Sequence, residues 1–194
     1  MIPQLPLIGR RALIAGAVCA PFAARAAAPG PRTRLILLGT GGGPTPKPNR
    51  SASATAIVID GRIHIVDCGD GVARQLVLAG LKSDALAHIY LTHHHSDHNA
   101  DYGNLLLLAW ANNLAHPVDT WGPPPLERMT RQFLALNKRD IKTRIADEGR
   151  PPLAPLIRAH ELNKGGTVFE DGQVRVTAAL VNHPPIVPSF CLPL

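Results

Sequence analysis

The sequence has only three cysteines among its 194 residues, and no two of them form a CxxC motif. Cys19 lies in an N-terminal leader, so a mature chain could form at most one disulfide, between Cys68 and Cys191. This scarcity excludes a disulfide framework. Cys68, in the segment Asp67-Cys68-Gly69, fits a small buried residue better than a metal ligand.

The sequence also lacks an apolar run that would cross a membrane comfortably. Its apolar leader segment, residues 12–24, is shorter than the roughly 20 residues that a transmembrane helix needs. Arg10-Arg11 precedes this segment, and Ala24-Arg25-Ala26 has the A-x-A form of a signal-peptide cleavage site. We therefore predict a signal peptide over residues 1–26, twin-arginine-like or of the ordinary secretory type, before a domain over 27–194. The protein would then be periplasmic or secreted by a bacterium.

Excess charge is small once this leader is set aside. Three of the 20 basic residues lie in residues 1–26, which contain no acidic residue, so 17 basic and 14 acidic residues remain. Together with export, a net charge of +3 argues against nucleic acid as a partner. The contents of 45% hydrophobic and 18% charged residues are typical of one globular domain. Neither value bears on the oligomeric state.

No nucleotide-binding loop follows the first predicted strand. This strand, residues 35–38, runs into Gly39-Thr40-Gly41-Gly42-Gly43, which invites a phosphate-loop interpretation. No Gly-Lys-Ser/Thr sequence follows, however, and Pro44 stands where a dinucleotide-binding loop has its third glycine. The glycines therefore indicate a tight turn.

The remaining hydrophobic patterns predict alternating strands and helices. Hairpins are indicated at Asp60-Gly61-Arg62 and Asp171-Gly172. Other strands are predicted over residues 87–91, 118–121 and 156–162, and helices over residues 72–79 with Asp70 as N-cap, up to residue 112 with Asn99 or Asp101 as N-cap, and after Pro123-Pro124-Pro125. Residues 138–152 are rich in both charges, which indicates a solvated face or, alternatively, a contact with a phosphate-bearing substrate.

Four histidines fall within six residues in the segment His93-His94-His95-Ser96-Asp97-His98. In extended backbone alternate residues point the same way, so His93, His95 and Asp97 would project together, and His98 would join them if the chain turns. Imidazole and carboxylate groups suit zinc and similar divalent ions. The alternative, a solvated polar turn rich in histidine, fits less well because a buried strand leads directly into the segment.

The segment Leu91 to His98 resembles the signature motif of the metallo-β-lactamase superfamily. This resemblance implies a two-metal hydrolase in which His93 and His95 hold one metal and Asp97 and His98 hold the other. It further implies that Asp97 orients or deprotonates a hydroxide formed on the metal. The resemblance is closest to the ribonuclease Z and arylsulfatase-like branch, which implies phosphodiester or sulfate ester bonds, in small molecules or larger phosphodiesters, as substrates.

Two further site residues follow from the same resemblance. His183, which comes after the strand ending at Val181, would complete the first metal site. Asp67 would support a ligand histidine, although satisfying backbone amides in its own turn is an equally good role. The other five histidines have no comparable argument and are interpreted as structural: His64, His88, His94, His116 and His160.

The resemblance implies an α/β fold, the αββα sandwich of the superfamily, with zinc as cofactor. The family also has an aspartate that bridges both metals and a last histidine at the second site. After His183 the chain contains no aspartate, glutamate or histidine. We therefore expect a domain truncated at its C-terminus, with the second half of the sandwich incomplete and the second metal site weak. The alternative to a hydrolase is an inactive product that binds one zinc or none.

Overall fold

A computed structural model describes residues 32–193 of the chain. The predicted signal peptide, residues 1–26, lies outside these described residues. Short 3₁₀ turns occur at Ser83–Ala85 and Ala154–Leu156. The other elements in chain order are β1 (Thr33–Gly39), β2 (Ala54–Ile59), β3 (Arg62–Val66), α1 (Val72–Leu78), β4 (Leu86–Tyr90), α2 (Ser96–Asn99), α3 (Tyr102–Ala111), β5 (Val118–Gly122), α4 (Leu126–Leu136), α5 (Lys138–Glu148), β6 (Ile157–Glu161), β7 (Gly166–Glu170), β8 (Arg175–Val181) and β9 (Ser189–Cys191).

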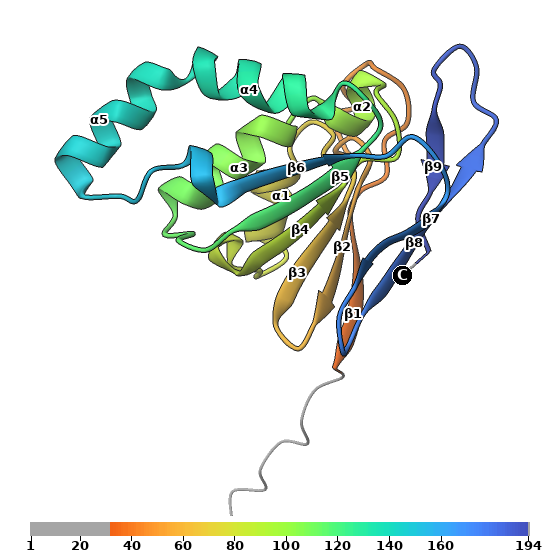
Figure 1. The fold of residues 1–194 in the computed structure, drawn as a ribbon, viewed down its shortest axis with the longest axis horizontal. Helices are drawn as coiled ribbons and strands as arrows, with labels where there is room; N and C mark the ends of the chain where they lie inside the picture. The colour runs from red at the N-terminus through yellow and green to blue at the C-terminus, as the bar shows by residue number, and fades with distance from the viewer. Residues whose placement is uncertain (1–31, 194) are drawn as a thin grey trace, which may run out of the picture. The chain divides into compact units, whose positions relative to one another are not determined.

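Strands β1 to β6 form a single sheet in chain order (Figure 1). β1, β2 and β3 pair antiparallel, and β3 to β6 pair parallel. Because parallel strands share a direction, the carboxyl ends of β3, β4 and β5 meet at one edge of the sheet. The loops that leave this edge carry Asp67, the histidine-rich segment 92–98 and Pro123. Sheet topology thus gathers three separate parts of the sequence at one edge.

The main hydrophobic core lies between this sheet and helices α1 and α3. Alternate residues of β2, namely Ala54, Ala56 and Val58, are buried in one cluster with Leu76 of α1 and Leu105 of α3. Burying a leucine of this kind contributes about 1.5–3 kcal/mol to folding. The core therefore fixes the sheet from which the polar loops emerge.

The second sheet consists of β7, β8 and β9 and lies on the other face of the first (Figure 1). It packs through a smaller hydrophobic cluster in which Tyr90 and Trp121 from the first sheet meet Val174 and Val176. The described residues thus form three layers, one of helices and two of sheet, in agreement with an αββα sandwich whose second half is incomplete. β8 ends at Val181, so this second sheet delivers His183 to the same edge.

The start of α1 differs from the sequence-based prediction. Gly71, with a left-handed φ of 86°, occupies the N-cap position, and Asp70 makes no capping hydrogen bond. The Gly71 N–H donates instead to Asp101 Oδ2 over 2.8 Å. Asp101 precedes α3 as predicted, but its carboxylate is used by α1 rather than by its own helix. The cap crosses between two packed helices, which local sequence cannot reveal.

Two other segments also depart from expectation. The polar region after residue 137 forms a regular helix, α5, with none of its residues buried. In β8 the alternation typical of a half-buried strand stops after Ala178, because Val176 and Ala178 are buried whereas Leu180 is 57% exposed. Leu180 pairs with Phe190 of β9, outside the cluster around Tyr90. No helix within residues 32–193 is long and apolar enough to cross a membrane.

Candidate metal centre

The histidine-rich loop is held firmly on both sides where it leaves the sheet. β4 ends at Tyr90 and α2 begins at Ser96, so residues 91–95 cross the sheet edge without regular structure. Leu91 is buried and its N–H donates to the carbonyl of Trp121 on β5 over 2.7 Å. On the other side, the Asp67 N–H donates to the Tyr90 carbonyl over 2.8 Å.

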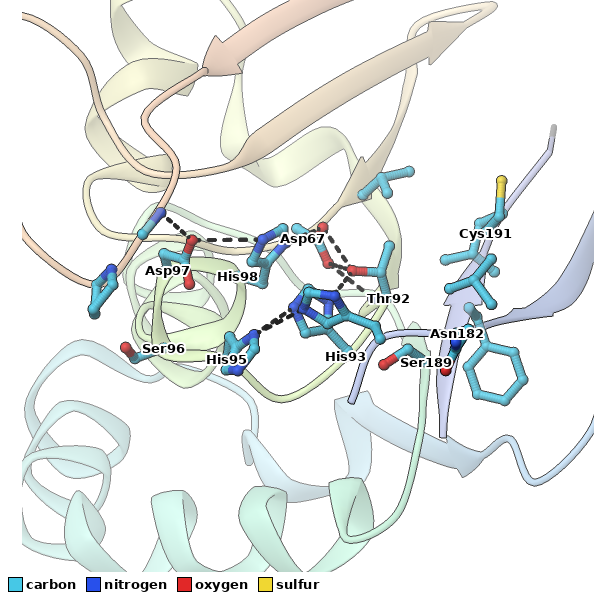
Figure 2. Close-up of a pocket in the computed structure, with 17 residues that line it drawn as sticks. Asp67, Thr92, His93, His95, Ser96, Asp97, His98, Asn182, Ser189 and Cys191 are labelled. Atoms are coloured by element: carbon cyan, nitrogen blue, oxygen red, sulfur yellow. Dashed lines mark hydrogen bonds and ion pairs between the residues drawn. The ribbon is translucent and has the colours of Figure 1, made fainter. Parts of the chain in front are cut away.

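Three imidazoles converge at this edge (Figure 2). His95 Nδ1 lies 3.0 Å from His93 Nε2 and 3.1 Å from His183 Nε2. Within the described residues this is the only group of three potential ligands, and its donor atoms all lie within 4.8 Å of one another. Three histidine nitrogens directed at one point are the donor set of a catalytic-type zinc site that keeps an open position. The residues present therefore fit a metal ion.

Hydrogen bonds fix which nitrogen His93 presents to this point. Thr92 Oγ1 donates to the Asp67 carboxylate, which is 2.9–3.0 Å away, and so it accepts from His93 Nδ1–H at 2.9 Å. This leaves the lone pair of His93 Nε2 free toward His95. Asp67 also accepts from the Thr92 N–H over 2.8 Å. Asp67 thus accepts hydrogen bonds from a backbone N–H of another loop and from the hydroxyl that holds His93.

Asp67 should be important for stability and for metal affinity. It is buried, with a left-handed φ of 63°, and Asp67→Ala would leave the half-buried Thr92 donors without this acceptor, at a cost of about 1–3 kcal/mol. Loss of the His93 orientation should weaken zinc binding by about 10–100-fold. Urea unfolding and chelator competition measure the two effects. Asp67→Asn is the matched control, because it keeps an acceptor oxygen and tolerates this φ. Equal stability of the parent and Asp67→Ala would contradict this role.

Asp97 and His98 form a second, smaller group beside the three histidines. The extended arrangement expected for residues 93–97 is wrong at Asp97, because Ser96 already begins α2 and the helical turn brings Asp97 next to His98. His98 Nδ1–H donates to Asp67 Oδ2 over 2.7 Å, and its Nε2 lies 3.6 Å from Asp97 Oδ2. His98 Nε2 and the Asp97 carboxylate could therefore share a cation. Figure 2 shows this pair across from the labelled His95 and His93.

Close backbone packing fixes the helix that carries this pair. The Cys68 N–H donates to the His98 carbonyl over 2.6 Å, and the Asp101 N–H donates to the Cys68 carbonyl over 2.9 Å. A Cβ at Gly69 would lie 2.3 Å from the Asp97 carbonyl oxygen, so only glycine permits this approach. The Gly43 N–H adds a hydrogen bond of 2.7 Å to Asp97 Oδ2.

The pKa of His93 shifts in the opposite direction to that of His98. Burial and the neighbouring His98 lower the pKa of His93 to about 4, so this imidazole is neutral near pH 7 and its lone pair is available to a metal. For His98, burial lowers the pKa, but the hydrogen bond and charge of Asp67 outweigh it, and the net shift is upward. For Asp97, burial raises the pKa, whereas the Gly43 N–H and His98 lower it by more.

The adjacent His94 is excluded as a ligand because both of its nitrogens are engaged. Its Nε2–H donates to the Pro123 carbonyl over 2.7 Å, and its Nδ1 accepts from Asn99 Nδ2 over 3.1 Å. His94 therefore ties the metal-binding loop to the β5–α4 turn. The sequence analysis missed this contact and also the hydrogen bonds that link Asp67 to His93 through Thr92 Oγ1. The only signal in the sequence was the position of Thr92 directly before His93.

The three histidines open onto a cavity of about 880 Å³. One wall carries the polar groups, and the other is formed by the chain after β8 and by β9, where Figure 2 labels Asn182, Ser189 and Cys191. Phe190 and Leu192 also line the cavity. The Phe190 N–H donates to the Thr92 carbonyl over 2.9 Å, which joins the two walls. This volume falls within the range of small-ligand sites.

Comparison with known proteins agrees with this geometry. The family model described as "Metallo-beta-lactamase superfamily" matches residues 48–193. The chain belongs to the metallo-β-lactamase superfamily. Among curated relatives in this superfamily, ribonuclease Z of Mycobacterium sp. (strain KMS) is 36% identical over 132 residues, covering 67% of this chain and 46% of that protein. Ribonuclease Z of Mycobacterium marinum is 35% identical over 133 residues, covering 67% and 47%.

Solved structures of metallo-β-lactamase proteins show the same fold. Human tRNase Z, short form, aligns with a TM-score of 0.65 at 25% identity, covering 80% of this chain and 62% of that one. YhfI from Bacillus subtilis, a metallo-β-lactamase fold protein, aligns with a TM-score of 0.57 at 17% identity, covering 82% and 56%. The chain thus spans about half the length of the curated relatives that it matches.

One prediction from the sequence is wrong in light of these relatives. The small net charge and the expected export argued against nucleic acid as a partner. The curated relatives are named ribonuclease Z, and the aligned human structure is a tRNase Z. Both names denote enzymes that act on RNA. Net charge failed as a guide because it averages over the whole surface, whereas an RNA contact needs only a local group of cations.

Proposed function

We propose that this chain carries the metal centre of a ribonuclease Z-like phosphodiesterase whose substrate is RNA. The observation that carries the proposal is the convergence of His93, His95 and His183 on one point at the floor of an open cavity. Membership of the superfamily and the ribonuclease Z names of the relatives supply the reaction class. Sulfate esters, the other class considered from the sequence, have no named counterpart among these relatives.

Zinc is the metal that we propose, because three imidazole nitrogens match its preferred ligands. When bound, such an ion acts as a Lewis acid and lowers the pKa of water to about 7. His93, His95 and His183 would hold it. His93 is the best prepared of the three, since its neutral state and its orientation are both set by neighbours.

Asp97 is the proposed group that orients the attacking water and accepts its proton. Its carboxylate is anionic near neutral pH, and one oxygen is held by the Gly43 N–H, so the side chain has a fixed direction. His98 would use the lone pair of its Nε2 to hold, together with Asp97, a second cation, and the direction of this nitrogen follows from the Nδ1–H bond to Asp67. Both residues line the cavity with the three histidines.

Cations beside the cavity support a phosphate-bearing substrate. Lys47 and Arg50 are exposed and line a smaller hollow that shares Gly43 and Asp97 with the main cavity. A phosphate next to the one being cleaved would lie within reach of these two side chains. A neutral ester would gain nothing from them.

The activity is tested with the purified, zinc-loaded chain on three substrates. Bis(p-nitrophenyl) phosphate and a labelled RNA hairpin with a single-stranded 3′ tail should both be hydrolysed, and p-nitrophenyl sulfate should not. The His95→Ala chain should hydrolyse none of them. Hydrolysis of only the sulfate ester would replace the proposed substrate class. No hydrolysis by a folded chain with one zinc bound would refute the activity.

One observation favours a second candidate, a chain that binds zinc without catalysis. Within the described residues, Asp97 and His98 are the only pair at the second metal position, and a two-metal reaction needs both sites filled. Metal analysis together with the hydrolysis assay separates the candidates.

We also propose export from a bacterial cytoplasm, on the basis of the leader sequence alone, and cell fractionation tests it.

A further inference from the structure

Helix α5 stands apart from the rest of the described fold. It follows α4 and extends beyond the sheet at one end of the molecule (Figure 1). None of its 11 residues is buried, and Leu136 at the α4–α5 junction is 82% exposed. A helix without a buried residue adds little to a hydrophobic core, so its role has to be sought at its surface.

The charges of α5 are sorted into two groups. Arg144 pairs with Asp140 at 3.1 Å and with Glu148 at 2.9 Å, so two of the three acidic side chains of the helix are used in ion pairs. Lys138, Arg139 and Lys142 are exposed, and none of them has a carboxylate within 4 Å among residues 32–193. Two of the acidic residues in this segment of mixed charge thus pair with Arg144, and the other three cations of the helix have no acidic partner among residues 32–193.

These three cations form one cluster. Lys142 lies one turn beyond both Lys138 and Arg139, at spacings of four and three residues, and such residues are neighbours on a helix surface. Like charges at these spacings destabilise a helix, and cations in its first turn oppose the helix dipole. Local stability therefore does not explain the cluster, which is the pattern expected where a surface binds an anion.

We propose that Lys138, Arg139 and Lys142 bind the phosphate backbone of the RNA whose scissile bond lies at the three histidines. The choice of RNA rests on the proposed function. The cavity of about 880 Å³ can hold only a nucleotide-sized part of an RNA, so the rest must run over the outer surface. Its phosphates need cations there that are not already paired.

The path from the cavity to the cluster is continuous along the chain. The Pro123 carbonyl, held by His94 of the metal-binding loop, lies just before α4. The 11 residues of α4 then span about 16 Å. Asn137 is the C-cap of α4, and α5 begins directly after it at Lys138. An RNA that leaves the cavity along α4 would meet the cluster at the end of that helix.

The test compares two triple variants with equal change in charge. Lys138→Ala/Arg139→Ala/Lys142→Ala removes the cluster, and Arg34→Ala/Arg74→Ala/Lys82→Ala removes three exposed cations elsewhere. Binding of a fluorescent RNA hairpin with a 3′ tail is measured from about 50 to about 300 mM salt. The cluster variant should bind at least about tenfold more weakly at low salt, and its salt slope should fall by about 2. The control should bind nearly as the parent does.

Bis(p-nitrophenyl) phosphate distinguishes this inference from the proposed function. This substrate fits within the cavity, so the cluster variant should hydrolyse it at the parental rate. Loss of RNA affinity in the cluster variant supports the surface even if the parent hydrolyses nothing. Equal RNA binding by the parent and the cluster variant, or an equal loss in both triple variants, would overturn it. So would cluster-dependent binding to phosphatidylglycerol vesicles with unchanged RNA affinity, which would assign the surface to a membrane.

Discussion

Replacing His95 with alanine should reduce the zinc content of the chain from about one ion to nearly none and abolish any hydrolysis. His95 is the central member of the trio, because its Nδ1 lies within 3.1 Å of both His93 Nε2 and His183 Nε2. Loss of a ligand should exceed the roughly 10–100-fold cost of losing an outer hydrogen-bond partner. Metal analysis after dialysis measures the loss directly, without depending on turnover.

Zinc should also stabilise the parent, and this gives an independent measurement. His183 comes from the second sheet and lies 88 positions after His95, so an ion held by both ties the two sheets together. At a zinc concentration of about 100 times Kd, the added stability is about 2.7 kcal/mol. The melting temperature of the parent should therefore rise with zinc, and that of His95→Ala should not.

His116→Ala is the control for both measurements. His116 is exposed, and its nitrogens contact only the carbonyls of Pro117 and Asp84. It should bind zinc and respond to zinc as the parent does. A His95→Ala chain that retains one tightly held zinc would show that the ion binds elsewhere.

The sequence predicted the parts of the site that depend on short spacing. The His93-x-His95 pattern and the strand before it were sufficient to place two candidate ligands at a strand end, because a strand has a fixed direction and period. The first hairpin was equally accessible, since Asp60 and Gly61 adopt the positive φ values that their residue types favour. His183 needed the family resemblance, because no local pattern links it to a loop 88 residues earlier.

Other features depend on contacts between distant residues and were not predictable. The turn that carries Asp97 away from the extended row depends on α2, which packs against Gly69 from another loop. The use of Asp101 as a cap for α1 depends on the packing of α1 against α3. The free cations of α5 emerge only once Arg144 is seen to use two of the acids. Composition gives the number of charges but not their pairing.

His64 and His88, which the sequence left as structural, should make the fold sensitive to acid. They lie between the two sheets, 1% and 3% exposed, with ring centroids 4.7 Å apart. Within residues 32–193, three of their four nitrogens and the Tyr90 hydroxyl have no hydrogen-bond partner. Arg62 donates to His88 Nε2 over 3.2 Å, so the proton of neutral His88 is on Nδ1. Protonating either ring would place a cation against Arg62 or against the other ring.

Burial lowers the pKa of each of these histidines from 6.5 to about 4, and the charge of Arg62 adds to the shift of both. His64 adds to the shift of His88, whereas Asp171 opposes both shifts and Asp119 opposes that of His88. Between about pH 6.5 and about pH 4, the unfolded chain therefore binds protons that the folded chain does not. Stability is therefore full above about pH 6.5 and falls as the pH drops toward about 4, by on the order of 3 kcal/mol for each histidine.

The double variant His64→Phe/His88→Phe should remove most of this pH dependence. Phenylalanine fills a similar volume and has no nitrogen to protonate, and it joins a cluster that already contains Trp121 and Phe169. Urea unfolding at about pH 8 and about pH 5, followed by tryptophan fluorescence, measures the effect. His93, whose pKa is also about 4, remains in the double variant and leaves a smaller residual slope. If the double variant loses as much stability at low pH as the parent, the acid sensitivity arises outside the His64–His88 pair.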